Sequence, residues 1–149
     1  MHKLLVISIA SPMLLGVYKD DSLVASFTLD DVASKQLPIM LEKLLDRYSF
    51  SEFIYVNSPG SFMALKIAYV SLKTISLIKN IPLKAVDGFA FNGNSPIKAI
   101  GKLYFIKEDG TITTVKKQDA LKQEFFLPKS LKGLEVSDRS TPKYEIPAV

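Results

Sequence analysis

Hydrophobic positions in the first part of the chain predict three strands in succession. They cluster in short runs between turn residues, and the expected strands are Leu4–Ala10, Met13–Lys19 and Leu23–Leu29. Ser11–Pro12 and Asp20–Ser22 provide the turns. Because both connections are tight, neighbouring strands are expected to run antiparallel.

A helical period follows, and it predicts a helix from Asp30 or Asp31 to about Tyr48. One apolar stripe is expected on it: Ala33, Leu37, Leu41, Leu44 and Tyr48. Pro38 interrupts the segment and predicts a kink or a later start. Ile39 lies on the opposite side among charged residues, so an apolar side chain is expected on the solvent face.

The next segment predicts a long helix between two buried strands, Phe53–Val56 and Leu83–Val86. Ser58 is the expected N-cap, Pro59 the first helical residue, and Asn80 the end of the helix. Because helices connect the last strands, these strands must lie parallel to one another, and the element order is βββαβαβ.

Both sides of this long helix carry apolar residues. One side is expected to pack on the protein's own sheet, with Leu65, Ile67, Leu72, Ile75 and Ile78 beside the small residues Ala64, Ala68 and Ser71. Two aromatic residues flanked by lysines are expected on the other side.

That second side has the composition of a partner interface, with aromatic anchors and a polar rim. Its predicted members are Ile39, Phe62, Lys66, Tyr69 and Lys73. Further chain from the same protein is the alternative cover for these side chains. On the interface reading, Tyr69→Glu leaves the monomer folded, whereas charge at Ala68 unfolds it.

The segment around this helix also resembles a known family. The run YVNSPGSFMALKIAYVSLKTISLIKNIPLKAV resembles the signature GRGPGSFTGLRIG, AKGLA and IPLxGV of the TsaB (YeaZ) family. The matching residues are Pro59, Gly60, Ser61, Phe62, Leu65, Ile67, Ile81, Pro82, Leu83 and Val86. The departures are Val56, Asn57 and Ser58 for Gly-Arg-Gly, Met63 and Ala64 for Thr-Gly, Lys66 for Arg, and Ala68 for Gly. The resemblance extends over about the first 90 residues.

The resemblance implies an α/β chain with the ribonuclease H-like core of the actin, sugar-kinase and Hsp70 group. It implies a non-catalytic cytoplasmic subunit for threonylcarbamoyl modification of adenosine in transfer RNA. The expected partner is a TsaD-like transferase subunit, bound through the two helices, with a TsaE-like ATPase as a further candidate and a homodimer in isolation. Family members are longer, so the second lobe is expected to be reduced.

Three parts of the chain are expected: a ribonuclease H-like lobe over 1–90, a reduced lobe over 91–127, and an irregular tail over 128–149. In the second lobe, Leu103–Lys107 and Thr111–Lys117 flank a turn that predicts a hairpin. A single helical turn is expected over Gln118–Gln123 and a last strand over Glu124–Leu127.

The composition is that of an ordinary globular domain, with 149 residues of which 48% are hydrophobic. A net charge of +4 without a basic run predicts only non-specific RNA binding by the chain alone, at roughly 10⁻⁴–10⁻⁶ M. The absence of cysteine excludes disulfides and thiolate metal sites. The uncharged runs are too short for a membrane span, and we interpret the apolar N-terminus as a strand rather than a signal peptide.

No catalytic, cofactor or metal site is expected. Ser8–Ala10 stands where the family pattern has Asp-Thr-Ser, and it offers neither glycine nor carboxylate for a nucleotide and magnesium. Gly60 and Ser61 are a weak candidate anion site at a helix start. His2 is the only histidine, and Asp87 is expected to cap the segment after it.

Two alternatives to the subunit role stay open. One is an enzyme, either an ATP-dependent phosphotransferase of the actin-like group or a peptidase. The other is a homodimeric scaffold unrelated to transfer RNA.

Overall fold

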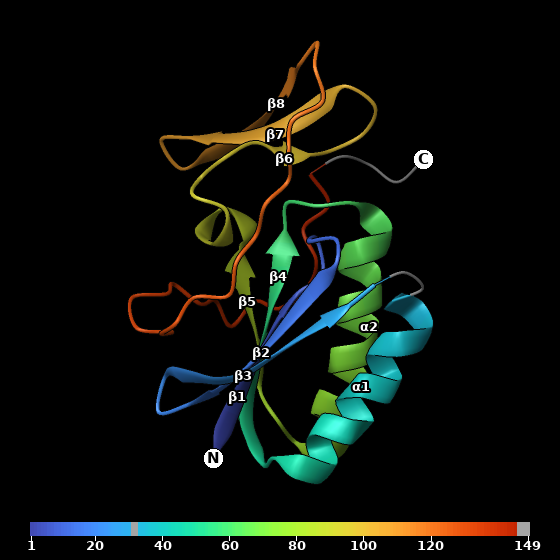
Figure 1. Ribbon diagram of the computed structural model, residues 1–149, viewed down its shortest axis with the longest axis vertical. Helices are drawn as coiled ribbons and strands as arrows, with labels where there is room; N and C mark the ends of the chain where they lie inside the picture. The colour runs from blue at the N-terminus through green and yellow to red at the C-terminus, as the bar shows by residue number, and fades with distance from the viewer. Residues whose placement is uncertain (31–32, 146–149) are drawn as a thin grey trace.

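The computed structural model describes residues 1–30 and 33–145 of the chain, which form a five-stranded and a three-stranded sheet with two long helices (Figure 1). The larger sheet contains β1 (His2–Ile7), β2 (Met13–Lys19), β3 (Ser22–Leu29), β4 (Phe50–Ser58) and β5 (Leu83–Asp87). Their order is β3-β2-β1-β4-β5. The first three strands are antiparallel and β4 and β5 run parallel to β1, which confirms the predicted mixed α/β sheet.

Both faces of this sheet are buried, which explains the continuous apolar run of β1. Leu4 and Val6 point into the core under the two helices, while Leu5 and Ile7 point into a second core on the other face. That second core is closed by Phe91 and by apolar residues of the C-terminal part of the chain. β1 begins at His2 and ends at Ile7, so the strand expected over Leu4–Ala10 starts two residues earlier and ends three residues earlier than predicted.

The first helix, α1 (Ala33–Arg47), confirms the predicted apolar stripe in its described part. Leu37, Leu41 and Leu44 are at most 2% exposed and pack in the core on the helix side of the sheet. Pro38 lies inside the helix, within its second turn. The expected cap at Asp31 lies outside the described residues.

The second helix, α2 (Phe62–Lys79), begins later than predicted, and the placement of Ser58 as its cap is wrong. β4 continues through Ser58 because this residue pairs with Asp87 of β5. The N-cap is Ser61, whose hydroxyl accepts a bond from the Ala64 N–H at 3.2 Å. The end agrees with the prediction, since Asn80 adopts a left-handed conformation (φ 56°) and donates its N–H to the Ser76 carbonyl.

A short 3-10 helix, η1 (Gly88–Phe91), leads to the smaller sheet of β6 (Ile97–Lys98), β7 (Leu103–Glu108) and β8 (Thr111–Lys116). The predicted hairpin is confirmed, with its turn at Asp109 and Gly110, both of positive φ. The helical turn expected over 118–123 and the strand over 124–127 are wrong. Tertiary bonds hold this segment instead: the Leu121 N–H donates to the Tyr104 hydroxyl, and the Phe126 N–H to the Phe91 carbonyl.

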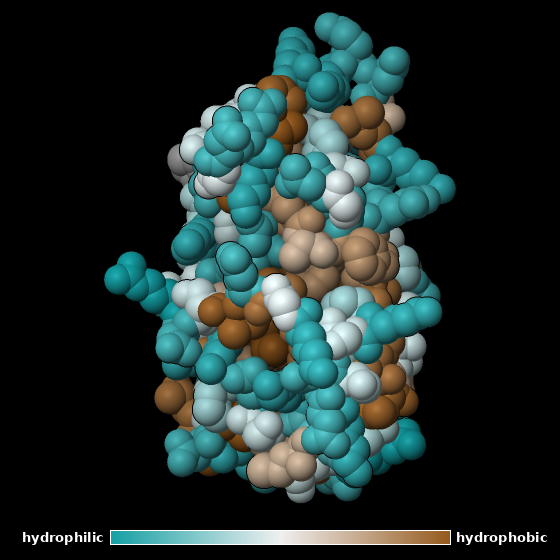
Figure 2. Space-filling view, turned by 90° about the vertical axis from the view of Figure 1, so that its left-hand side faces the viewer, coloured by the Kyte–Doolittle hydropathy of each residue, from teal (hydrophilic) through white to brown (hydrophobic). Residues whose placement is uncertain are grey.

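The C-terminal segment, residues 128–145, crosses the sheet from one edge to the other (Figure 1). Figure 2 shows the side of the molecule that lies on the left in Figure 1, where polar and apolar residues are mixed. Near the β3 edge, Leu23 donates its N–H to the Lys129 carbonyl. At the β5 edge, Ala85 and Ser137 exchange two backbone bonds of 2.9 and 2.8 Å. The segment contains no helix or strand in its described part, but backbone bonds fix its path across the larger sheet.

Two buried tyrosines tie this segment to the sheet, and they predict a loss of stability in alkali. Tyr18 donates its hydroxyl to the Pro128 carbonyl at 2.7 Å, and Tyr55 donates to the Ser140 carbonyl. Burial raises the pKa of both hydroxyls above their ordinary value, and in Tyr55 the nearby Tyr69 and Tyr144 add to the rise.

A raised pKa in the folded state stabilises the fold below the unfolded pKa of about 10, and this contribution is lost as the pH rises beyond it. The free energy of unfolding should therefore fall more steeply above pH 10 than in the control, Tyr18→Phe with Tyr55→Phe. Urea titrations between pH 8 and 11 measure both slopes. Identical slopes would show that these hydroxyls do not contribute.

Candidate functional site

The outer side of α2 exposes a stripe of large apolar side chains. Met63, Val70 and Leu77 are seven residues apart, so they lie along one line of the helix, and their exposed fractions are 57%, 52% and 71%. Ile78 is 74% exposed beside them. Ile39 of the neighbouring α1 is 56% exposed. We call these five residues the helix surface.

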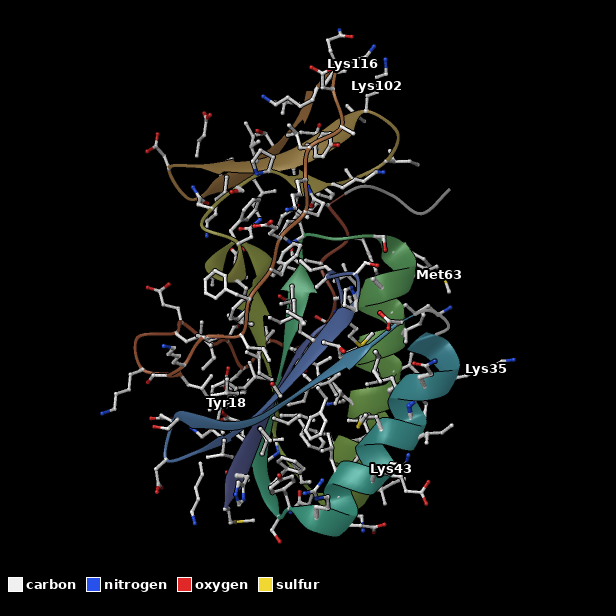
Figure 3. All side chains as sticks on the ribbon, viewed as in Figure 1. Tyr18, Lys35, Lys43, Met63, Lys102 and Lys116 are labelled. Carbon is white, nitrogen blue, oxygen red and sulfur yellow. The ribbon has the colours of Figure 1, made fainter. Side chains whose placement is uncertain are left out.

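Polar residues surround the helix surface. Lys66 and Thr74 are exposed on α2 and Lys43 is exposed on α1. Lys35 of α1 points outward on the same side as Met63 (Figure 3). Exposed apolar side chains within a polar rim are the composition of a protein interface. The helix surface is therefore the candidate docking site, although most of its members differ from those predicted.

The predicted interface residues lie on one flank of this surface. Lys66 is exposed, whereas Phe62, Tyr69 and Lys73 are half-buried. Tyr69 packs against the helix-side core, with its ring 6.1 Å from that of Tyr55. The interface role of these residues stays a prediction.

The buried side of α2 consists of Leu65, Ala68, Leu72 and Ser76. Ala68 and Leu72 are fully buried as predicted, but the placement of Ile78 beside the core is wrong. Ser76 is the last of the buried residues of α2, and its hydroxyl donates to the Ile81 carbonyl at 2.5 Å. Ile78 lies beyond that contact.

Part of the predicted interface is covered by the protein's own chain, which is the alternative to a binding partner given in the sequence analysis. The Tyr144 ring lies 4.7 Å from the Phe62 ring, and the Lys66 ammonium lies 5.7 Å from the centre of the same ring. Nearby, the Ser58 hydroxyl bonds the Glu145 carboxylate at 3.0 Å. Phe62 is thus packed within the monomer.

A second candidate region is the edge of the sheet at which β4 and β5 end. A cleft of about 400 Å³ opens there, lined by Asp87, Lys107 and Glu135 among others. Asp87 accepts the Phe89 N–H at 2.8 Å, which confirms its predicted capping role, and it pairs with the Lys107 ammonium. Both carboxylate oxygens of Asp87 are therefore engaged, one in capping η1 and the other in joining β5 to β7 of the smaller sheet.

Ile9 fills the centre of this edge, in the turn where a nucleotide-binding protein of this topology would need small residues. A methyl group added to Gly60 would lie 2.2 Å from the Ile9 side chain, and one added to Gly88 would lie 2.6 Å from it. Next to it, the buried Ser8 hydroxyl has no hydrogen-bond partner among the described residues. The turn between β1 and β2 is thus packed on both glycines.

Gly60→Ala is expected to destabilise the fold by about 1–3 kcal/mol, because the new methyl group forces Ile9 out of its position. Ile9→Ala combined with Gly60→Ala removes the clash, so the double variant should lose less stability than the sum of the two single variants. Urea denaturation of the four proteins measures this coupling. Strict additivity would contradict the close contact.

The candidate anion site at Gly60 and Ser61 has few groups left that could bind an anion. The Ser61 hydroxyl already caps α2, and Ile9 covers Gly60. The His2 ring lies against the Tyr48 ring in a tilted arrangement, with ring centres 4.8 Å apart. In residues 1–30 and 33–145, no three metal-binding side chains of His, Cys, Asp or Glu come together, and no helix there has the length and hydrophobicity to cross a membrane.

Comparison with known proteins gives a result for structure but not for sequence. No protein-family model matches the chain. No curated protein matches it either. YeaZ from Pseudomonas aeruginosa aligns with a TM-score of 0.60 and 12% sequence identity, over 83% of this chain and 71% of that one.

A second solved structure is described as an uncharacterized protein with similarity to the peptidase YeaZ from Pseudomonas aeruginosa. It aligns with a TM-score of 0.63 and 12% identity, over 83% of this chain and 70% of that one. The resemblance inferred from the loop and helix around Gly60 is thus supported by the solved structures, and the chain has the fold of YeaZ, also called TsaB.

Proposed function

We propose that this protein is a TsaB-like subunit that supports threonylcarbamoyl modification of transfer RNA by docking a TsaD-like transferase on its helix surface. The observation that carries the proposal is the line of exposed Met63, Val70 and Leu77 on a chain with the YeaZ fold. Large apolar residues aligned on one helix face are costly in water unless a partner covers them.

The sheet order also supports the ribonuclease H-like interpretation of the fold. Three antiparallel strands followed by two parallel ones, with each crossover helix on the same face, agree with the element order expected for that group. In the proposal the sheet is a rigid base that holds α1 and α2 side by side.

The proposed role is that of a scaffold rather than an enzyme. Ile9 packs against Gly60 and Gly88 where a nucleotide would need space, and Asp87 is bonded to Phe89 and Lys107. The groups that a phosphotransferase would use at this edge serve packing and capping in this chain.

Affinity capture from the source cells, followed by measurement of threonylcarbamoyl-adenosine in transfer RNA after gene deletion, tests the proposal. Recovery of a TsaD-like protein and loss of the modified nucleoside are expected. Recovery of only a second copy of the chain, with normal modification, would favour the homodimeric scaffold and overturn the proposed role.

A further inference from the structure

Four exposed lysines that are dispersed in the sequence lie at one end of the smaller sheet. They are Lys98 at the end of β6, Lys102 in the turn before β7, and Lys116 and Lys117 at the end of β8. The Lys117 N–H donates to the Lys102 carbonyl at 2.9 Å. Lys102 and Lys116 point away from the body of the molecule, at the end remote from α1 (Figure 3). We call these four residues the lysine end.

The charge of the lysine end is not neutralised by ion pairs within the described part of the chain. The remaining lysine of the sheet, Lys107, pairs with Asp87. The acidic residues of the sheet, Glu108 and Asp109, lie in or beside the turn at its opposite end. The smaller sheet is therefore electrically polarised, and its lysine end concentrates as many positive charges as the net charge of the whole chain, +4.

The spacing of the strands brings the four ammonium groups within reach of one binding partner. β6 and β8 flank β7, so their backbones are about 10 Å apart. Each lysine carries its charge on a flexible four-carbon stem. A polyanion that lies across the end of the sheet can contact all four.

We propose that the lysine end binds the phosphate backbone of RNA. Phosphate contacts require positive charge and little else, whereas a protein partner would need several apolar or aromatic anchors, and the turn between Lys98 and Lys102 exposes a single large apolar residue, Ile100. In the pairing of β6 with β7, Tyr104 lies opposite Lys98. Tyr104 is only 3% exposed, so an RNA base cannot stack on its ring. Binding is thus independent of base sequence, and the choice of RNA over other polyanions rests on the proposed function.

Titration of a transfer RNA transcript with the isolated chain, at several salt concentrations between 50 and 200 mM, tests the inference. Neutralising Lys98, Lys102, Lys116 and Lys117 to Gln should weaken binding at low salt about ten-fold or more. The slope of log affinity against log salt should become shallower by roughly 3, because about four counterion-releasing contacts are lost.

The matched control neutralises four exposed lysines outside the smaller sheet and outside the helix surface: Lys19, Lys79, Lys129 and Lys132. It makes the same change in net charge, and its slope should change by less than a third as much. Equal slopes in the two variants would show that the binding is diffuse and overturn the inference. Absence of RNA binding by the unmodified chain at 50 mM salt, or tighter binding to vesicles with anionic lipids than to RNA, would also overturn it.

This titration uses the chain alone, so its outcome is separate from that of the partner capture. RNA binding without recovery of a TsaD-like protein would count against the proposed function and retain the lysine end. Recovery of the transferase, with the same slope of log RNA affinity against log salt in the lysine-end variant as in the unmodified chain, would support the proposed function and overturn the inference about the lysine end.

Discussion

Ala68→Glu is expected to destabilise the fold by about 4 kcal/mol or more, a large part of the roughly 5–15 kcal/mol by which an ordinary domain is stable. Ala68 is fully buried in α2 and packs in the helix-side core. A glutamate there would have to place its carboxylate among Leu65, Leu72 and the sheet, without a hydrogen-bond donor. Its charge would be neither solvated nor paired.

Val70→Glu is the matched control for this substitution. It adds the same charge two residues later in the same helix, at a position that is 52% exposed, and should change the free energy of unfolding by about 0.5 kcal/mol or less. Urea denaturation followed by circular dichroism compares the two variants. If both destabilise equally, the rotation of α2 about its axis is not the one described.

Val70→Glu is also expected to weaken association through the helix surface by about 2 kcal/mol or more, roughly a thirty-fold loss of affinity. The substitution places a charge in the middle of the line from Met63 to Leu77, where docking would remove it from water. Tyr69→Glu is less informative, because Tyr69 packs against the core and its replacement would change stability as well.

Val24 on the edge strand β3 provides a matched control for association. It is the same residue type with the same exposed fraction, 52%, but it belongs to the strand at the far edge of the sheet. Sedimentation velocity reports self-association of each variant, and capture of the TsaD-like protein reports the heterologous contact. A loss with Val24→Glu and none with Val70→Glu would move the docking site away from the helix surface.

The strands were predictable because most of them are covered on both sides. β2 has the predicted bounds, and β3 and β5 each differ by one residue. β4 is longer than its apolar run because its two ends are defined by pairing with neighbouring strands, and the run contains no information about those partners. The start of α2 was misplaced for the same reason.

The rotation of α2 could be predicted only in part. Apolar residues occur around most of this helix, so the small residues located the inner side correctly at Ala68, but the outer side was ambiguous. Tyr69 lies near Lys66 and Lys73 on the helix, which predicts an outward position, and the sequence gives no indication that Tyr55 lies beneath it. The alignment of Met63 with Val70 could have been predicted from the sequence, because residues seven positions apart lie along one line of a helix.

The lysine end could not be predicted by scanning for basic runs. Its four members come from three segments, and only the antiparallel pairing of β7 with its two neighbours brings them together. The packing of Ile9 on Gly60 and Gly88 depends likewise on three separate segments of the chain. Such sites exist only in the folded chain.

The path of residues 128–145 depends largely on main-chain groups. Backbone atoms join Leu23 with Lys129, Ala85 with Ser137, and Asn57 with Lys143. Two tyrosine side chains and one asparagine side chain also donate to carbonyls of this segment. Any residue other than proline offers the same amide and carbonyl, so most substitutions in the segment leave its attachments intact. Exposed positions of the segment can therefore change their side chains while the backbone keeps the same route across the sheet, so similarity of fold can persist where similarity of sequence is low.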